Sequence, residues 1–307
     1  MQSQTRQAAN HTIIGSLMVL VAAIALSSKA IIVKLAYVYF VDASTLIALR
    51  MAFSAPFFIG LAFWAHISPA TLKISKQDGW MMALFGALGG YGPMLLDFAG
   101  LAYVTAGLER VILFLYPAIV IMFSAILFKH RIGKREWFAL VITYIGVVLA
   151  VGHDLSLAKS GSADTLLGAA LVLASSITYA AYLVYSGWAI PRIGSASFTA
   201  YTMLAAAATS GVHYVSTTHS VSILHLPAQV YWLSLLMAVV ATVLPALLLN
   251  AGIHRIGSNK SSLVSSIGPI STILLAYFFL GEHITWLQLS GTGLVLIGVL
   301  AISMAKK

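Results

Sequence analysis

The stretch Trp80-Met-Met-Ala-Leu-Phe-Gly-Ala-Leu-Gly-Gly-Tyr-Gly-Pro93 has its tryptophan and proline at the same spacing as Trp232-Leu-Ser-Leu-Leu-Met-Ala-Val-Val-Ala-Thr-Val-Leu-Pro245. The two stretches lie 152 positions apart, and neither contains a charged residue. The same shift pairs further small or rare residues: Gly100 with Gly252, Pro117 with Pro269, and Gly146 with Gly298. Because the chain has only 6 Trp and 8 Pro, these matches in one ungapped register indicate an internal repeat.

The composition places this repeat in a membrane. Hydrophobic residues make up 60% of the 307 residues and charged residues 8%, and the mean hydropathy is +0.97, whereas a soluble domain usually carries about 25% charged residues. Charge-free stretches long enough to cross a bilayer, which takes roughly 20 residues, recur along the chain. We therefore predict an all-α polytopic membrane protein with ten transmembrane helices, at about residues 12–39, 43–66, 79–103, 106–128, 135–152, 165–187, 195–215, 228–254, 260–280 and 284–304.

The basic residues predict the topology. Lys and Arg concentrate in short cytoplasmic loops, and with the N-terminus inside, twelve of the 17 basic residues fall on the cytoplasmic side. They are Arg6, Lys73, Lys76, Lys129, Arg131, Lys134, Arg135, Arg192, Arg255, Lys260, Lys306 and Lys307. The external loops hold only Lys159. We predict a multi-pass protein of a prokaryotic inner membrane with both termini cytoplasmic, and we interpret the net charge of +9 as topological, with no nucleic-acid partner.

The repeat divides the chain into a cytoplasmic tail (1–11), a first repeat (12–152), an external linker (153–164), a second repeat (165–304) and a tail (305–307). Because each repeat holds five helices, an odd number, the second copy enters the membrane in the opposite sense, an arrangement typical of secondary transporters. A cleavable signal peptide competes for the N-terminus, since residues 13–24 form an apolar run and Ala23-Ile-Ala25 resembles a cleavage site. With one gap, however, residues 15–20 match residues 168–173, which favours retention of the first helix.

Several motifs resemble the EamA family of the drug/metabolite transporter superfamily. They are Leu96-Asp-Phe-Ala-Gly-Leu-Ala-Tyr-Val-Thr-Ala-Gly107, Leu113-Phe-Leu-Tyr-Pro117 and Tyr144-Ile-Gly-Val-Val148, with the echoes Ser266-Ile-Gly-Pro269, Leu280-Gly-Glu-His-Ile284 and Leu296-Ile-Gly-Val299. The resemblance covers nearly the whole chain. It implies two five-helix repeats, a central cavity lined mainly by helices 1, 3, 4, 6, 8 and 9, and transport of small metabolites, often export of amino acids.

One departure from the family pattern is visible. Gly281 and Glu282, which end helix 9, are replaced after helix 4 by Lys129 and His130. We interpret these residues as shaping helix ends, with a topological rather than a functional consequence.

Ionisable residues inside the membrane are the strongest functional signal, because a charge at that depth costs at least about 2.5–3.5 kcal/mol on insertion scales. The set comprises Lys29, Lys34, Arg50, Asp97, Glu109 and Arg110, all in the first repeat and all predicted to lie in the outer half of the membrane. Its sum is +2, so we expect water or an anionic group to meet the excess. In helix 9 a polar stripe includes Ser262, Ser265, Ser266 and Thr272, and the 152-residue shift maps Ser262 onto Arg110, which predicts that Arg110 faces inward.

From these arguments we derive the predicted site. The substrate-binding residues are Lys29, Arg50, Tyr91, Asp97, Arg110, Tyr116, Tyr179, Tyr182, Ser265 and Ser266. The candidates for proton coupling are Asp97 and Glu109, and the candidates for helix kinks and gating are Pro93, Pro117, Pro245 and Pro269.

Each of these residues also has a structural interpretation. Glu109 and Arg110 could mark a helix terminus, where the helix dipole favours the acid. Arg50 could form a salt bridge with Asp97 or extend to the interface. The small residues on the helix 3 face, which are Gly86, Gly89, Pro93 and Gly100, could serve close helix packing, and Lys34 near a helix end could extend to the headgroups.

The predicted function is a secondary transporter of small polar metabolites, with amino-acid export by alternating access favoured. An organic-anion or phosphate-ester antiporter and an anion channel stay open as alternatives. Cysteine is absent and the histidines at 213, 219 and 225 lack the spacing of a zinc site, so we predict no metal. No phosphate-binding glycine motif and no nucleophile and base pair stands out, so we predict no cofactor and no enzymatic activity. The expected partners are a small-molecule substrate and the lipid bilayer, and a homodimer is left open.

Overall fold

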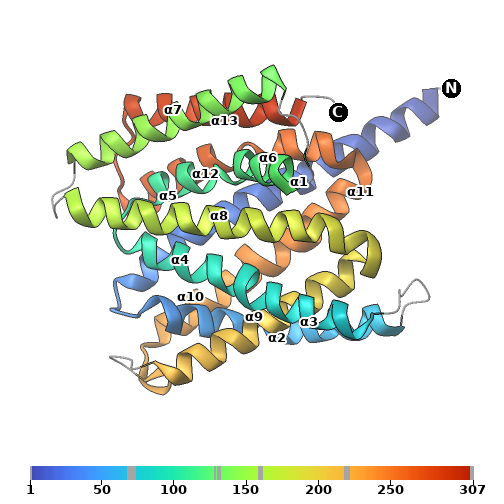
Figure 1. Cartoon of the computed structure of the whole chain (residues 1–307), viewed down its shortest axis with the longest axis horizontal. Coiled ribbons are helices and arrows are strands. Elements are labelled where there is room, and N and C mark those ends of the chain that lie inside the picture. The colour runs from blue at the N-terminus through green and yellow to red at the C-terminus, as the bar shows by residue number, and fades with distance from the viewer. Residues whose placement is uncertain are drawn as a thin grey trace.

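The protein is a bundle of long helices that run roughly along one direction (Figure 1). The computed structural model describes residues 2–67, 74–127, 129, 133–157, 162–217 and 222–304, and this part of the chain contains no strand. Six of its helical spans are long and apolar enough to cross a membrane, and three shorter apolar helices accompany them. The chain is therefore an all-α polytopic membrane protein.

The first repeat contributes the following elements: α1 (Gln2–Tyr37), α2 (Ala43–Ile67), α3 (Lys76–Phe85), the π-helical segment η1 (Gly86–Tyr91), α4 (Gly92–Leu101), α5 (Ala106–Leu113), α6 (Tyr116–Leu127) and α7 (Lys134–Leu157). The second contributes α8 (Ser162–Ile193), α9 (Ser195–Ser216), the 3-10 turn η2 (Ile223–His225), α10 (Ala228–Ala238), the π-helical segment η3 (Val239–Val243), α11 (Leu244–Ser265), α12 (Gly268–Leu280) and α13 (Trp286–Met304).

Four prolines follow interruptions of regular helix, at equivalent places in the two repeats. Pro93 and Pro245 come directly after the π-helical segments, and Pro117 and Pro269 come directly after the breaks between α5 and α6 and between α11 and α12. Proline lacks a backbone N–H and its ring crowds the carbonyl four residues earlier, so the preceding turn widens or breaks. The repeat in the sequence is therefore also a repeat of backbone irregularities.

Close packing between glycines relates the two repeats in space. A Cβ atom on Gly100 of α4 would lie 2.9 Å from the carbonyl oxygen of Gly168 on α8, and one on Gly252 of α11 would lie 3.0 Å from that of Gly15 on α1. These two crossings are counterparts in the register found in the sequence. The packing of α1 on α11 accordingly makes the first helix part of the fold.

Lengthening either glycine by one methyl group should destabilise the protein by similar amounts. In Gly100→Ala and Gly252→Ala the new Cβ would collide with a neighbouring valine and carbonyl, and overpacking typically costs about 1–3 kcal/mol. The control is Gly60→Ala, where a Cβ would meet nothing within 4 Å. Thermal unfolding in detergent measures the effect. If only one of the two variants lost stability, the packing equivalence of the repeats would be contradicted.

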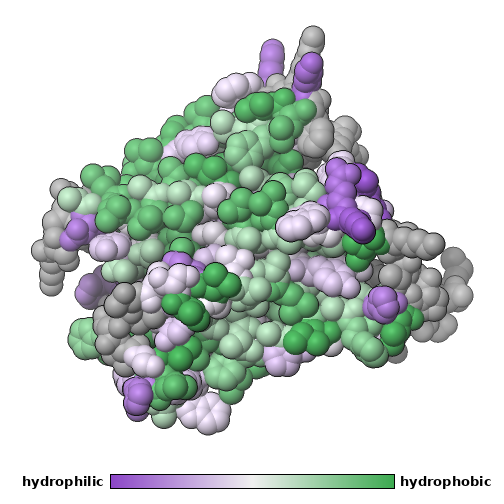
Figure 2. All heavy atoms as spheres, turned by 60° about the horizontal axis from the view of Figure 1, so that its bottom comes forward, coloured by the Kyte–Doolittle hydropathy of each residue, from purple (hydrophilic) through white to green (hydrophobic). Residues whose placement is uncertain are grey.

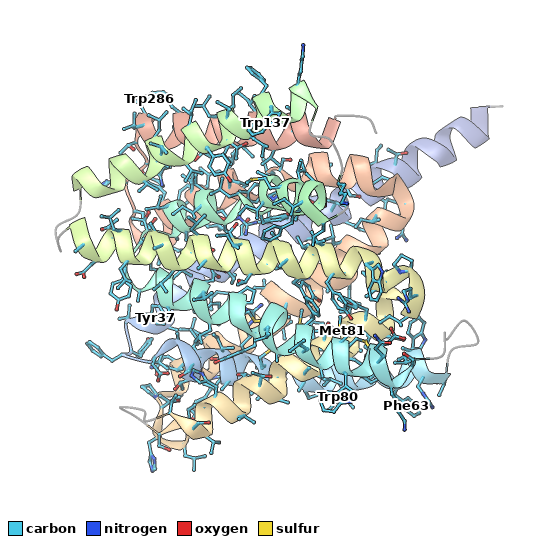
Figure 3. The ribbon with its side chains drawn as sticks, in the orientation of Figure 1. Tyr37, Phe63, Trp80, Met81, Trp137 and Trp286 are labelled. Atoms are coloured by element: carbon cyan, nitrogen blue, oxygen red, sulfur yellow. The ribbon has the colours of Figure 1, made fainter. Side chains whose placement is uncertain are left out.

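The outside of the bundle is apolar, as a lipid-facing surface must be. Figure 2 shows apolar side chains over much of one face, with hydrophilic ones toward its edges. The repeat-related Trp80 and Trp232 are 79% and 67% exposed, and Figure 3 shows Trp80 with Phe63, Trp137 and Trp286 at the periphery of the bundle. The largest buried apolar cluster instead lies among α1, α2, α4 and α10.

One predicted helix boundary was wrong. Instead of two helices separated at residues 254–260, α11 runs without a break through Arg255 and Lys260 to Ser265. No proline occurs between Pro245 and Pro269, so nothing interrupts the backbone hydrogen bonds until the turn before Pro269. The predicted linker 153–164 contains the last residues of α7 and the first of α8, and residues 158–161 between them lie outside the described part.

Candidate functional site

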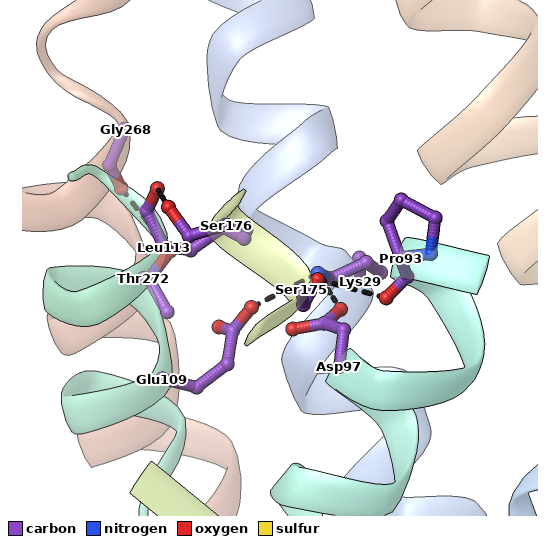
Figure 4. A network of polar contacts seen from close by, with 9 residues as sticks. All are labelled: Lys29, Pro93, Asp97, Glu109, Leu113, Ser175, Ser176, Gly268 and Thr272. Atoms are coloured by element: carbon purple, nitrogen blue, oxygen red, sulfur yellow. Dashed lines mark hydrogen bonds and ion pairs between the residues drawn. The ribbon is translucent and has the colours of Figure 1, made fainter. Parts of the chain in front are cut away.

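Three ionisable residues that the sequence placed at a common depth meet inside the bundle (Figure 4). Lys29 comes from α1, Asp97 from α4 and Glu109 from α5. The Lys29 Nζ pairs with Asp97 Oδ2 and lies 2.9 Å from Glu109 Oε1. Glu109 is fully buried and Asp97 is 4% exposed. One ammonium therefore bridges two buried carboxylates.

Each carboxylate keeps one oxygen free of protein partners. Asp97 Oδ1 and Glu109 Oε2 are buried and accept no hydrogen bond from the described residues. Leaving a buried polar group unsatisfied costs about 1–3 kcal/mol. The site thus presents two buried acceptors to any donor that enters it.

Arg110 supplies a cationic group beside these acceptors. Its guanidinium carbon lies 5.2 Å from the ring centroid of Phe114, and its Nη2 would lie 2.7 Å from a Cβ built on Gly268. The buried Nε has no hydrogen-bond partner in the described part, and the charge acts electrostatically on both Lys29 and Glu109. The formal charges of Lys29 and Arg110 balance those of Asp97 and Glu109, and we call this arrangement, with charges of both signs and no formal net charge, the dipolar site.

The interrupted helices explain why these groups come together. Gly268 opens α12 directly after the break that precedes Pro269, and its missing side chain leaves space for the Arg110 guanidinium. Its carbonyl oxygen accepts hydrogen bonds from Ser27 of α1 at 2.9 Å and from Thr272 at 3.1 Å. The α11–α12 break therefore brings α1 and α5 into contact with the same glycine.

A row of tyrosines begins next to Arg110 and continues along α8. The ring centroids of Tyr116 and Tyr179 lie 5.3 Å apart, and those of Tyr179 and Tyr182 lie 6.2 Å apart. The Arg110 charge acts on both Tyr116 and Tyr179, while the Tyr182 hydroxyl lies 3.2 Å from Thr202 Oγ1. Three predicted site residues, Tyr116, Tyr179 and Tyr182, thus form one continuous row of aromatic contacts that begins near the guanidinium.

Other predicted residues make different contacts. Arg50 Nε donates to Thr242 Oγ1 at 3.0 Å, and the Arg50–Asp97 salt bridge left open by the sequence does not form in the described structure, where Asp97 pairs with Lys29. The Tyr91 hydroxyl forms a hydrogen bond with Nδ1 of His213 on α9.

The serines predicted for the site lie at the end of α11. Ser265 is the last residue of α11 and is half-buried, and Ser266 follows it in the break, two residues before Gly268, and is buried. The side chain of Ser262 lies outside the described residues.

The small residues of the predicted helix 79–103, which the structure divides into α3, η1 and α4, serve helix packing. A Cβ on Gly86 would collide with the carbonyl oxygen of Thr202 on α9, and one on Gly89 would collide with Tyr182 on α8. Together with Gly100 against α8, these contacts confirm the packing interpretation and leave Asp97 as the polar group that this face brings to the site.

Sequence reasoning missed the role of Glu282. Its carboxylate accepts hydrogen bonds from the backbone N–H groups of Ala106, at 2.9 Å, and Gly107, at 3.3 Å. Thr105 caps the same helix end through the N–H of Leu108. Glu282, which the sequence predicts to shape the end of its own helix, therefore caps α5 of the other repeat. The sequence signal for this role was that His130, at the equivalent position of the first repeat, is not an acid.

Comparison with known proteins gives four findings. The EamA-like transporter family matches residues 13–152 and 166–304. An uncharacterized transporter of Bacillus subtilis, YcbK, is 32% identical over 95% of this chain and 92% of its own length. The threonine/homoserine exporter RhtA of Salmonella typhimurium is 27% identical over 86% of this chain and 81% of its own. A solved crystal structure shares the fold, with a TM-score of 0.63 at 16% identity over 94% of this chain and 95% of the other.

Proposed function

Because the chain belongs to the EamA-like transporter family, we propose that it is a secondary transporter that exports small amino acids by alternating access. The observation that carries this proposal is the dipolar site. Asp97 and Glu109 each keep a buried acceptor oxygen without a partner, and the guanidinium of Arg110 makes no ion pair with any described residue.

A zwitterion complements this arrangement. An α-ammonium group would donate to Asp97 Oδ1 and Glu109 Oε2, and an α-carboxylate would accept from Arg110. Hydrogen bonds between charged groups are stronger than neutral ones, and such a ligand would add no net charge to a neutral site. The row that starts with Tyr116 and Tyr179 would then contact the amino-acid side chain. The likeness to a threonine/homoserine exporter supports the same substrate class.

The orientation and location belong to this proposal. We define the Glu282 face as the end of the bundle that holds residues 38–42, 102–105 and 281–285, on the left in Figure 1. The bias of basic residues toward the opposite end supports a Glu282 face outside the cell, cytoplasmic termini and insertion in the inner membrane. Export is then movement from the opposite face to the Glu282 face.

An organic-anion or phosphate-ester antiporter is the second candidate. The supporting observation is that Arg50, buried at 7% exposure, and Arg110 both lack an ion pair among the described residues. The two carboxylates beside Lys29 would repel an anion, which is why the zwitterion is favoured. A channel is a third, weaker alternative.

Solute counterflow in proteoliposomes tests the proposal. Vesicles preloaded with an unlabelled amino acid should accumulate the same labelled amino acid transiently, because a carrier exchanges solute one for one. Counterflow with phosphate esters alone would replace the proposal by the anion antiporter. If neither class gave counterflow but the vesicles passed anion current, the protein would be a channel.

A further inference from the structure

Glu282 connects the two repeats at one face of the membrane. It follows Gly281, which ends α12 in the left-handed conformation with φ of 66°, a conformation that glycine adopts without strain. This turn directs the Glu282 carboxylate to the first two backbone N–H groups of α5, those of Ala106 and Gly107. An acid is stabilised there, because the first N–H groups of a helix lack intrahelical partners and carry partial positive charge.

A second side chain of the same repeat packs on the same turn of α5. A Cβ built on Gly107 would overlap Nε2 of Gln288, and Gln288, near the start of α13, is 7% exposed. The first turn of α5 is therefore contacted by two residues that follow α12. Glycine at 107 is required for this close approach.

The internal repeat does not duplicate the acid of this contact. The 152-residue register places His130 at the counterpart of Glu282, and Ser258 and Asn259 at the counterparts of Ala106 and Gly107. The first repeat therefore has no acid at the equivalent sequence position, and the cap formed by Glu282 on a helix of the other repeat has no counterpart in this register.

The same short helix carries the site. Glu109 and Arg110 lie in α5, two and three residues after Gly107, and Arg110 rests on Gly268 at the other end of α12. Any separation of α5 from α12 at the Glu282 face would break the cap and uncover these two residues. We propose that the carboxylate of Glu282 on the N–H groups of Ala106 and Gly107 is a latch that keeps the site closed toward the Glu282 face until it is released. This inference goes beyond the proposed function. It requires only that the site can open alternately to the two sides of the membrane, and it does not depend on which substrate is transported.

The absence of cysteine allows a direct test. A single Ser266→Cys substitution places a reporter thiol two residues before Gly268, and a membrane-impermeant thiol reagent then measures its accessibility from each face, in intact cells and in inside-out vesicles. Adding Glu282→Gln should raise the modification rate from the Glu282 face about tenfold, which corresponds to about 1.4 kcal/mol of lost preference for the closed state. The rate from the opposite face should fall.

The matched control is Asp42→Asn. Asp42 caps α2 at the same face, accepting from the N–H of Thr45 at 3.0 Å, and this hydrogen bond lies within the first repeat. It should leave both rates unchanged in the reporter background.

Two results would overturn the latch: an unchanged rate from the Glu282 face, or equal increases from both faces, which would indicate general loosening. If Glu282→Gln does not fold, Gln288→Ala provides the same measurement, and the same two outcomes count against the proposal. Because thiol accessibility needs no substrate, its result is independent of whether amino acids show counterflow.

Discussion

Replacing Lys29 by Met is expected to lower the apparent melting temperature of the detergent-solubilised protein by roughly 10 °C. The Lys29 ammonium is the group that pairs with both Asp97 and Glu109, and methionine would leave two carboxylates close together without a cation between them. Removing one partner of a buried ion pair typically costs about 3–5 kcal/mol, and each kcal/mol shifts the midpoint by roughly 2–4 °C in a protein of more than 150 residues.

Two further variants make this expectation specific. Lys76→Met makes the same chemical change at an exposed position at the start of α3 and should leave the melting temperature unchanged within about 1 °C, since surface substitutions usually have small effects. Adding Glu109→Gln to Lys29→Met should restore part of the loss, because only one carboxylate then remains. If the double variant were less stable than Lys29→Met, like-charge repulsion would not be the cause.

Proton coupling through Asp97 or Glu109 stays a prediction. Measuring transport driven by a pH gradient in Asp97→Asn and Glu109→Gln would test it.

The depth of the charged residues could be predicted from sequence, but their partners could not. A rise of about 1.5 Å per residue places Lys29, Asp97 and Arg50 at comparable heights, which is why all three were candidates for one site. Height does not say which neighbouring helix a side chain faces. The sequence offered Arg50 as a salt-bridge partner for Asp97, whereas the packing of α1 against α4 and α5 brings Lys29 to Asp97 instead.

The inverted repeat was predictable because identical residues mark identical backbone irregularities. The continuity of α11 was not, since charges such as Arg255 mark where the apolar layer ends, whereas a helix ends where its backbone hydrogen bonds end. The missing acid in the first repeat could have singled out Glu282, but its partner could not be predicted, because Glu282 and Ala106 are separated by 176 positions and nothing local links them.

Arg110→Ala should reduce amino-acid counterflow at least about 100-fold, since hydrogen bonds to a charged group contribute about 1.5–3 kcal/mol each and a guanidinium can offer two to a carboxylate. Arg110→Lys should retain part of the activity, because it keeps the charge but offers no planar pair of donors. Both variants should keep the wild-type melting temperature within a few degrees, since Arg110 makes no ion pair with the described residues. Initial rates of labelled amino-acid entry into preloaded vesicles measure the effect.

The control for this loss is Arg192→Ala. Arg192 also stacks on an aromatic ring four residues away in its own helix, with its guanidinium carbon 4.2 Å from the Trp188 centroid. Arg192 lies in the last turn of α8, away from the site. Its side chain is 52% exposed, and its Nη2 lies 3.9 Å from Asp78 Oδ1. We expect this variant to retain counterflow. Equal losses in the two variants would mean that removing any stacked arginine impairs the carrier. The carboxylate site would then have to be sought at Arg50, which is buried and makes no ion pair in the described structure.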